Sequence, residues 1–284
     1  MPKILIIGAS SFLGKNLIED LPKSWEIHGS YFNDSAFPEF AGKFSNVKPF
    51  RLDISRETIT LPSGTYDDVI YLAANSDPRK SAEIPDVDLA LNAGGIIKIC
   101  SAAKFSRLIY ISSGSVYNPV PLPYMISKKA GEEYVKYFAS AKGFSYIILR
   151  LFYVYGPHIP ENRLIKKLVN DLAAGRKEFT ILGDGKNLIN PLYVKDFTSA
   201  MQSIISSSQK NLQLDLCSDS DMTLTELISR VAKCFSTKIS VKYEGQPLEK
   251  NLFHGDNSRF RKLFRFSARS LEEGILDWKK SLRP

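Results

Sequence analysis

The start of the chain carries the feature that most restricts its fold. Lys3–Ile7 is a short apolar run rich in β-branched residues, and it leads into a loop bounded by Gly8 and Gly14. The next residues, 15–21, place apolar side chains at helical spacing. A buried strand, a glycine turn and a helix in this order are the context that a dinucleotide-binding fingerprint requires. Gly8 permits the tight turn, Gly14 permits close packing of helix on strand, and the helix N-terminus offers N–H groups to a pyrophosphate.

Strands alternate with helices through the first half of the chain. We expect strands over residues 48–52, 68–74, 107–111 and 145–150, with helices over 86–104 and 124–142. This rhythm predicts an α/β fold with a doubly wound parallel sheet (Rossmann). Beyond Gly156-Pro157 the elements become shorter and mixed, which predicts a smaller mixed α/β C-terminal domain. We therefore expect a dinucleotide-binding domain over 1–152, to which the segment of about 190–206 returns, and a substrate-binding domain over 153–284.

A second pattern lies near the middle of the chain. Tyr124 is followed four residues later by Lys128, and Ser113 stands eleven residues before Tyr124, at the end of an apolar run. Residues four apart share one helix face, so Lys128 can stand behind Tyr124 and lower the pKa of a phenol that is about 10 in isolation. Ser113 would then hold a carbonyl or hydroxyl oxygen beside the phenol. Because Ser113, Ala73 and the Gly8 loop all follow strand ends, we expect them at one edge of one sheet, where ligands bind.

Composition indicates which partners and which cellular location to expect. The 284 residues carry a net charge of +8, and the first interpretation is a solvated basic face. Among functional interpretations the charge favours phosphate-bearing substrates over nucleic acid or a membrane surface. No apolar run approaches the roughly 20 residues of a membrane span, and the start has no signal-peptide layout, so we expect a cytoplasmic protein. Cys100, Cys217 and Cys234 are scattered among apolar neighbours, which favours free thiols and no metal site.

The side chain that would distinguish NAD from NADP at the adenosine ribose is less clear. An acid near the end of the second strand usually receives the ribose hydroxyls, whereas a nearby Arg accommodates a 2′-phosphate. The tip of that strand carries Tyr31, Phe32 and Asn33, with Asp34 a little late and no Arg directly following. NAD and NADP both stay open as the cofactor.

Taken together, the motifs resemble the extended short-chain dehydrogenases, the NAD-dependent epimerase/dehydratase family that acts mostly on nucleotide sugars. The matching positions include Gly8, Gly14, Asp53, Leu72-Ala-Ala74, Asn92, Ser112-Ser113, Tyr124-x-x-Ser-Lys128 with Glu132, Arg150, Tyr155-Gly-Pro157, Gly183-Asp-Gly185 and Tyr193-Val-x-Asp196. The resemblance implies that Tyr124 is the acid–base residue, that Ser113 takes the place of the catalytic Ser/Thr, and that Lys128 lowers the Tyr124 pKa and binds the nicotinamide ribose. It implies that cofactor contacts come from Gly8, Ser10, Ser11, Phe12, Leu13, Gly14, Tyr31, Asp53, Ile54, Leu72, Ala73, Ala74, Asn92, Tyr124 and Lys128.

The departures from the family pattern narrow the reaction. Gly114 and Ser115 stand where the family's dehydratases carry an Asp-Glu pair, and Ile189 stands where an Arg commonly grips the nucleotide diphosphate. We therefore expect hydride transfer at a sugar keto or hydroxyl carbon, as reduction or C4 epimerisation, with a slight preference for reduction. The alternatives are a reductase of a non-nucleotide aldehyde or ketone and a non-catalytic NAD(P)-binding regulatory protein. Candidate substrate residues are Ser76, Ser115, Tyr153, Arg163 and Asn190. The family layout also favours a homodimer.

Overall fold

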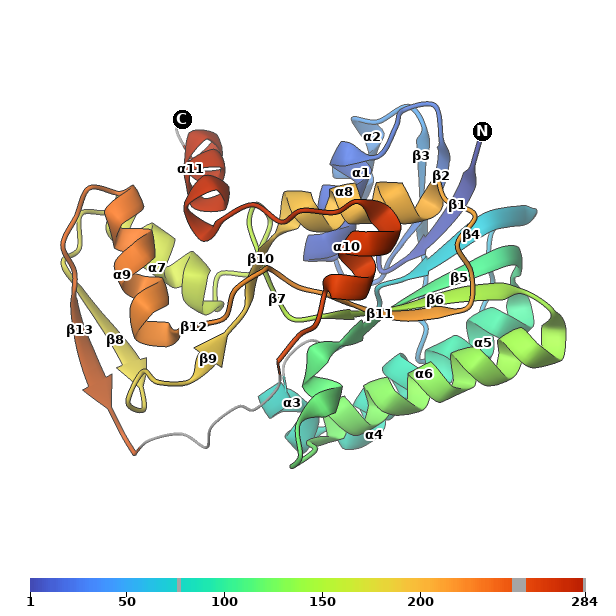
Figure 1. The fold of residues 1–284 in the computed structure, drawn as a ribbon. Helices are drawn as coiled ribbons and strands as arrows, with labels where there is room; N and C mark the ends of the chain where they lie inside the picture. The colour runs from blue at the N-terminus through green and yellow to red at the C-terminus, as the bar shows by residue number, and fades with distance from the viewer. Residues whose placement is uncertain (76–77, 247–253, 283–284) are drawn as a thin grey trace.

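The computed structural model describes residues 1–75, 78–246 and 254–282, and it confirms the predicted α/β class. Seven parallel strands form one sheet in the order β11-β6-β5-β4-β1-β2-β3 (Figure 1). The strand bounds are Lys3–Ile7 for β1, Glu26–Tyr31 for β2, Val47–Arg51 for β3, Thr65–Tyr71 for β4, Lys104–Ser113 for β5, Ser145–Leu151 for β6 and Leu212–Leu216 for β11. The strand order reverses between β1 and β4, which is the point where open sheets of this kind bind ligands.

Helices cover both faces of this sheet (Figure 1). One face carries α1 (Phe12–Asp20), α2 (Phe37–Gly42) and α8 (Val194–Ile205), and the other carries α5 (Gly95–Ala102) and α6 (Pro123–Lys142). The side chains of β1 alternate between the two cores, with Ile4 and Ile6 in the first and Leu5 and Ile7 in the second. A strand that is buried on both faces needs apolar residues at every position, which explains the uninterrupted run at the start of the chain.

The predicted helix over 86–104 is divided in the structure. It consists of α4 (Pro85–Leu89), a π-helical turn (Ala90–Gly94) and α5, and it is preceded by the short α3 (Pro78–Glu83). Two buried tyrosines reach the turn from the sheet: Tyr71 Oη donates to Leu91 O at 2.6 Å and Tyr110 Oη to Asn92 O at 3.3 Å. These hydroxyls occupy carbonyls that a regular α-helix would use internally, which accounts for the bulge.

The remaining elements form a smaller group beside the sheet (Figure 1). Three two-stranded pairings occur there, β7 with β10, β8 with β13 and β9 with β12. The strand bounds are Tyr153–Tyr155 for β7, Glu178–Leu182 for β8, Leu188–Ile189 for β9, Pro191–Tyr193 for β10, Met222–Thr223 for β12 and Ser240–Glu244 for β13. The helices of this group are Leu164–Ala173 for α7, Leu224–Cys234 for α9 and Leu271–Ser281 for α11. Helix α10 (Ser258–Phe264) lies instead against α8 and β11 of the large sheet (Figure 1). This smaller mixed part agrees with the predicted fold class.

The chain returns from this smaller group to the large sheet. Lys195 Nζ lies 2.8 Å from Asp20 Oδ1, and Thr198 Oγ1 donates to Asp20 Oδ2 at 2.6 Å, so α8 is fastened to α1. Beyond α8, β11 pairs in parallel with β6 and forms the edge of the sheet. The returning segment therefore extends past the expected residues 190–206, as far as Leu216.

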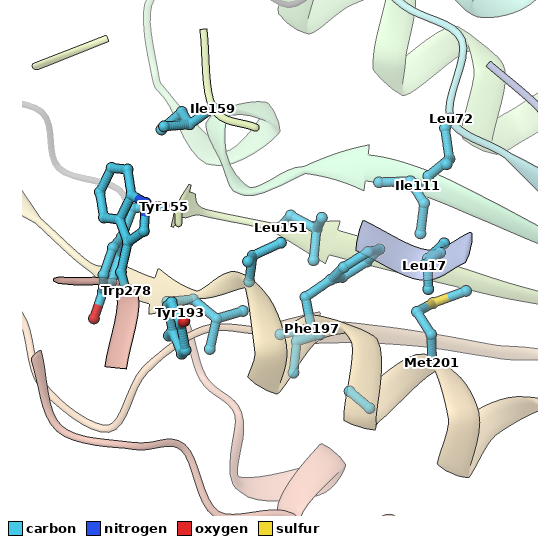
Figure 2. Close-up of a cluster of buried hydrophobic side chains, with 14 of the residues drawn as sticks. Leu17, Leu72, Ile111, Leu151, Tyr155, Ile159, Tyr193, Phe197, Met201 and Trp278 are labelled. Carbon is cyan, nitrogen blue, oxygen red and sulfur yellow. The ribbon is translucent and has the colours of Figure 1, made fainter. Parts of the chain in front are cut away.

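An aromatic cluster ties the C-terminal helix to this return. Figure 2 shows Tyr155, Tyr193 and Trp278 grouped together, with the α8 side chain Phe197 further along and Met201 beyond it, near Leu17. The ring centroids of Tyr155 and Tyr193 are 5.5 Å apart, and those of Tyr155 and Trp278 are 6.4 Å apart. All three rings are almost fully buried, so the cluster fixes α11 against β7 and β10.

No helix among the described residues has the length and apolar character needed to cross a membrane.

Candidate functional site

The loop after β1 brings three chain segments very close together. Gly8 has φ +88°, and a Cβ there would lie 2.8 Å from Ala73 N. A Cβ on Gly14 would collide with the backbone of Ala9. Ser11 is the N-cap of α1, and its Oγ accepts from Gly14 N at 3.2 Å. Both glycines are therefore required by close backbone approach, and the tight loop with its helix N-terminus has the shape and donors that a pyrophosphate needs.

The neighbouring strand ends lie where the sequence pattern places them. Leu72 N and Ala73 N both donate to Ile7 O, at 2.8 and 3.0 Å, so the exit of β4 runs directly beside the Gly8 loop. Ala74 follows on the same path. Ser10, Phe12 and Leu13, which belong to the loop and the first turn of α1, are partly buried.

The predicted adenosine contacts gather at the tips of β2 and β3. The Asp53 carboxylate accepts from Ser55 Oγ at 2.6 Å and from Arg56 Nε at 3.3 Å, and these hydrogen bonds hold its pKa below the usual value. Ile54 is buried beside it, and Tyr31 ends β2 with its ring packed against α2. A cavity of about 240 Å³ opens here. Its lining residues are Phe32, Arg51, Leu52, Asp53, Arg56, Thr58, Ile59 and Thr60.

Ser113 and Tyr124 meet at the carboxyl edge of the sheet. Ser113 ends β5 and caps a short 3₁₀ helix, where its Oγ lies 2.7 Å from Ser115 Oγ. Tyr124 lies in the first turn of α6, near the Ser113 side chain. Burial raises the pKa of Tyr124 to about 12, the Ser113 hydroxyl and the Arg163 charge oppose the rise, and Asp88 adds to it. The structure thus brings Ser113, Ser115 and Tyr124 together and places a cation, Arg163, close enough to act on the phenol.

Lys128 lies one helical turn further on and is buried. Its Nζ donates to Ile111 O at 2.8 Å and stands 5.0 Å from the centroid of the Tyr110 ring. Burial lowers the pKa of Lys128 to about 7, although Asp88 and Glu132 favour the charged form. Arg163 is the cation that opposes the rise of the Tyr124 pKa. That Lys128 lowers this pKa stays a prediction.

A buried polar cluster beside Lys128 was not predicted. The Asp88 carboxylate is fully buried, and its Oδ2 accepts from Ser127 Oγ at 2.7 Å and, more weakly, from Asn92 Nδ2 at 3.4 Å. Asn92 Nδ2 also donates to Ser127 Oγ at 2.9 Å. Asn92, which the sequence assigns to the cofactor, is therefore tied to the helix that carries Tyr124 and Lys128. The signal that could have found Asp88 is its place four residues before Asn92, on the same helix face.

A second buried cluster supports the end of β5. Arg150 makes a two-point ion pair with Glu132, with distances of 2.8 and 2.6 Å. Glu132 Oε1 also accepts from Ser112 Oγ at 2.6 Å. The Arg150 guanidinium lies 4.6 Å from the Tyr117 ring centroid, and Tyr117 Oη donates to Asp215 at 3.0 Å. The cluster joins β5, α6, β6 and β11 directly beneath Ser113.

The candidate substrate residues fall into different surroundings. Arg163 is the N-cap of α7, and it also acts on Tyr153, whose Oη accepts from Ile165 N at 3.4 Å. Asn190 is buried next to Tyr153, whose N donates to Asn190 O at 3.3 Å. Its side chain is engaged elsewhere, with Nδ2 donating to Asp221 Oδ1 at 2.8 Å and Oδ1 accepting from Ser218 N at 2.7 Å. Its amide holds the 218–221 loop.

Ser76, the last candidate substrate residue, lies outside the described residues.

Gly114 leaves no room for a side chain. It is buried, and a Cβ at this position would lie 2.5 Å from the Phe152 ring. The absence of an acid directly after Ser113 is thus built into the packing of this part of the chain.

Comparison with known proteins points to one family. A model of the NAD dependent epimerase/dehydratase family matches residues 4–215, which include the Gly8 loop, Ser113, Tyr124 and Lys128. The UDP-glucose 4-epimerase of Mycolicibacterium smegmatis is 24% identical over 225 residues, covering 70% of this chain and 71% of that protein.

Two solved structures illustrate the shared fold. UDP-glucuronic acid 4-epimerase from Bacillus cereus, in complex with UDP-glucuronic acid and NAD, is 22% identical with a TM-score of 0.84, covering 99% of this chain and 100% of that chain. RMD from Pseudomonas aeruginosa, complexed with NADPH, is 20% identical with a TM-score of 0.79, covering 99% and 100%.

Proposed function

The chain belongs to the NAD dependent epimerase/dehydratase family, and from that premise we propose that it is an NAD(P)-dependent oxidoreductase acting at the keto or hydroxyl carbon of a nucleotide-activated sugar. The observation that carries the proposal is the placement of the Ser113 hydroxyl and the Arg163 charge close enough to Tyr124 to act on its pKa, at the sheet edge that also holds the Gly8 loop. A proton donor and an oxygen-binding hydroxyl thus stand together where a dinucleotide would end.

The residues divide the work between cofactor and substrate. The Gly8 loop and the α1 N-terminus would hold the pyrophosphate, Asp53 would meet the adenine, and Lys128 would bind the nicotinamide ribose. When bound, the nicotinamide cofactor supplies or accepts the hydride. Residues 1–152 with the returning segment would form the cofactor-binding part, and the rest of 153–284 would bind the substrate.

We favour reduction as the net reaction because Ile189 replaces the Arg that commonly grips a nucleotide diphosphate and no acid ends β2. Tyr124 would donate its proton to a keto oxygen that Ser113 orients. Gly114, pressed against Phe152, provides no acid for eliminating water. C4 epimerisation is the second candidate because the M. smegmatis and B. cereus proteins carry the name 4-epimerase.

A panel of nucleotide sugars and 4-keto sugars, monitored by nicotinamide absorbance, tests the reaction. A reductase consumes reduced cofactor stoichiometrically with a keto sugar, whereas an epimerase interconverts sugars without net consumption. Tyr124→Phe should lower turnover by about 10²-fold or more while dinucleotide binding stays nearly intact. The matched control is Tyr134→Phe, since Tyr134 is exposed on the same helix. Unchanged turnover in Tyr124→Phe rules out its role as the acid.

We also propose that the protein is a homodimer that associates through α6. Ile126, Tyr134 and Tyr137 are 54%, 41% and 63% exposed, and their spacing places them along one side of the helix. A row of large exposed apolar side chains marks a surface that another chain covers. Sedimentation velocity should show a dimer that Tyr137→Glu weakens, and a wild-type monomer at micromolar concentration contradicts this proposal. The predicted cytoplasmic location stays a prediction.

A further inference from the structure

The tip of β2 has no free carboxylate for the adenosine ribose. Tyr31 ends the strand, and its ring is packed against Phe37 with centroids 5.7 Å apart. The nearest acid on the following loop, Asp34, is already engaged, since its Oδ2 lies 2.7 Å from Lys15 Nζ and its Oδ1 accepts from Ala36 N. An enzyme that recognises the 2′-hydroxyl usually places an acid at this tip.

An arginine stands in the neighbouring position instead. Arg51 is the last residue of β3 and is directly opposite Tyr31 in the strand register, where Leu52 N donates to Tyr31 O at 2.8 Å. Its guanidinium stands 5.9 Å from the centroid of the Phe32 ring. Within residues 1–75, 78–246 and 254–282, Arg51 takes part in no ion pair, whereas Arg56 beside it is bound to Asp53 at 3.3 Å.

Both Arg51 and Phe32 line the 240 Å³ cavity at the predicted adenosine end. A guanidinium presents a planar set of donors that matches a phosphate in two-point geometry. The Phe32 ring lies within cation–π range of this guanidinium. The cavity therefore offers an unpaired cation where an NAD-specific site offers an acid.

We propose that Arg51 binds the 2′-phosphate of NADP(H) and that the protein prefers NADP(H) to NAD(H). This inference rests on the proposed function, because it presumes that the adenosine of a dinucleotide lies between the tips of β2 and β3. It resolves the choice of cofactor that the sequence leaves open.

Direct binding of dinucleotides to the full chain tests the proposal without any substrate. Isothermal titration should give a Kd for NADP⁺ at least about tenfold below that for NAD⁺. Arg51→Ala should weaken NADP⁺ binding by about 10- to 100-fold and change NAD⁺ binding by less than about twofold. Arg51→Lys keeps the charge but loses the two-point geometry of the guanidinium, so its NADP⁺ affinity should lie between those of the wild type and Arg51→Ala. Retained NAD⁺ binding shows that each variant is folded.

The matched control is Lys48→Ala, which removes one positive charge from the same strand. Lys48 is exposed, pairs with Glu26 at 2.8 Å, and lies outside the cavity lining. It should leave both dissociation constants unchanged, and adenosine 2′,5′-bisphosphate should displace NADP⁺ better than AMP does. NAD⁺ binding as tight as NADP⁺ binding, or an Arg51→Ala variant with unchanged NADP⁺ affinity, overturns the inference alone. Failure of both dinucleotides to bind overturns the proposed function with it.

Discussion

Lys128→Met should make the protein more stable near neutral pH, although it removes a residue of the candidate site. Burial lowers the pKa of Lys128 from 10.5 to about 7. Each pH unit of such a shift corresponds to about 1.4 kcal/mol, so the buried ammonium costs the folded state about 5 kcal/mol below pH 7. Methionine has similar length and no charge. The variant also loses the hydrogen bond to Ile111 O, and this loss reduces its gain in stability by about 1–3 kcal/mol. A net gain of a few kcal/mol is expected near pH 6.

Lys128 binds its proton more weakly in the folded chain than in the unfolded chain, and this difference makes stability depend on pH. Between about pH 7 and pH 10 the unfolded chain keeps the Lys128 proton and the folded chain has lost it, so wild-type stability rises with pH in this window. The variant lacks this contribution. The advantage of Lys128→Met should therefore shrink by about 1.4 kcal/mol per pH unit above pH 7, or by about 3 kcal/mol at about pH 9.5.

Urea denaturation of both proteins from about pH 6 to about pH 9.5 measures this difference, and subtraction cancels the groups that the two proteins share. Lys129→Met is the matched control, since Lys129 is the next residue on α6 and its side chain is 54% exposed. Its stability curve should run parallel to that of the wild type. If the Lys128→Met curve is parallel too, Lys128 does not lose its proton near pH 7 and the reasoning is wrong.

Three further substitutions probe the packing around the site. Glu132→Gln leaves the Arg150 charge buried without its partner and should lower the free energy of unfolding by about 3–5 kcal/mol. Glu133→Gln, on the exposed side of the helix, is the control and should be nearly neutral. Equal denaturation midpoints for the two variants contradict this prediction. Gly114→Ala pushes a methyl group into Phe152 and should cost about 1–3 kcal/mol, and an unshifted melting temperature means that the ring can move away. Asp88→Asn removes a charge that raises the Lys128 pKa, so the pH above which stability begins to rise should fall below 7. Urea denaturation over the same pH range measures it, and a shift of this pH to higher values shows that Asp88 does not raise the Lys128 pKa.

The sheet and the cofactor loop could be predicted because their constraints are local. Residues 4–7 are apolar since β1 is buried on both faces, Gly14 is required by the backbone of Ala9 in the same loop, and Gly8 has a positive φ. The expected strand over 145–150 and helix over 124–142 lie within a residue of β6 and α6 for the same reason. Each element depends on its own apolar period and turn residues.

Other features depend on side chains that meet only in the folded chain. The hydroxyl of Tyr71 reaches the π-helical turn from another segment, and nothing in residues 86–104 announces it. Helical spacing places Lys128 on the same face as Tyr124, but the carbonyl of Ile111 determines where its ammonium goes. Arg163 acts on Tyr124 from far along the chain. The residue types of the candidate site could be predicted, whereas the pairings among them required the structure.

The late position of β11 has a consequence for synthesis. The first six strands of the sheet are complete once the ribosome has passed Leu151, but the strand that pairs with β6 ends only at Leu216. Until then the nascent chain presents the apolar strand β6 with an open row of backbone donors and acceptors, which invites pairing with other chains. That edge therefore stays uncovered for as long as the ribosome needs to make residues 152–216.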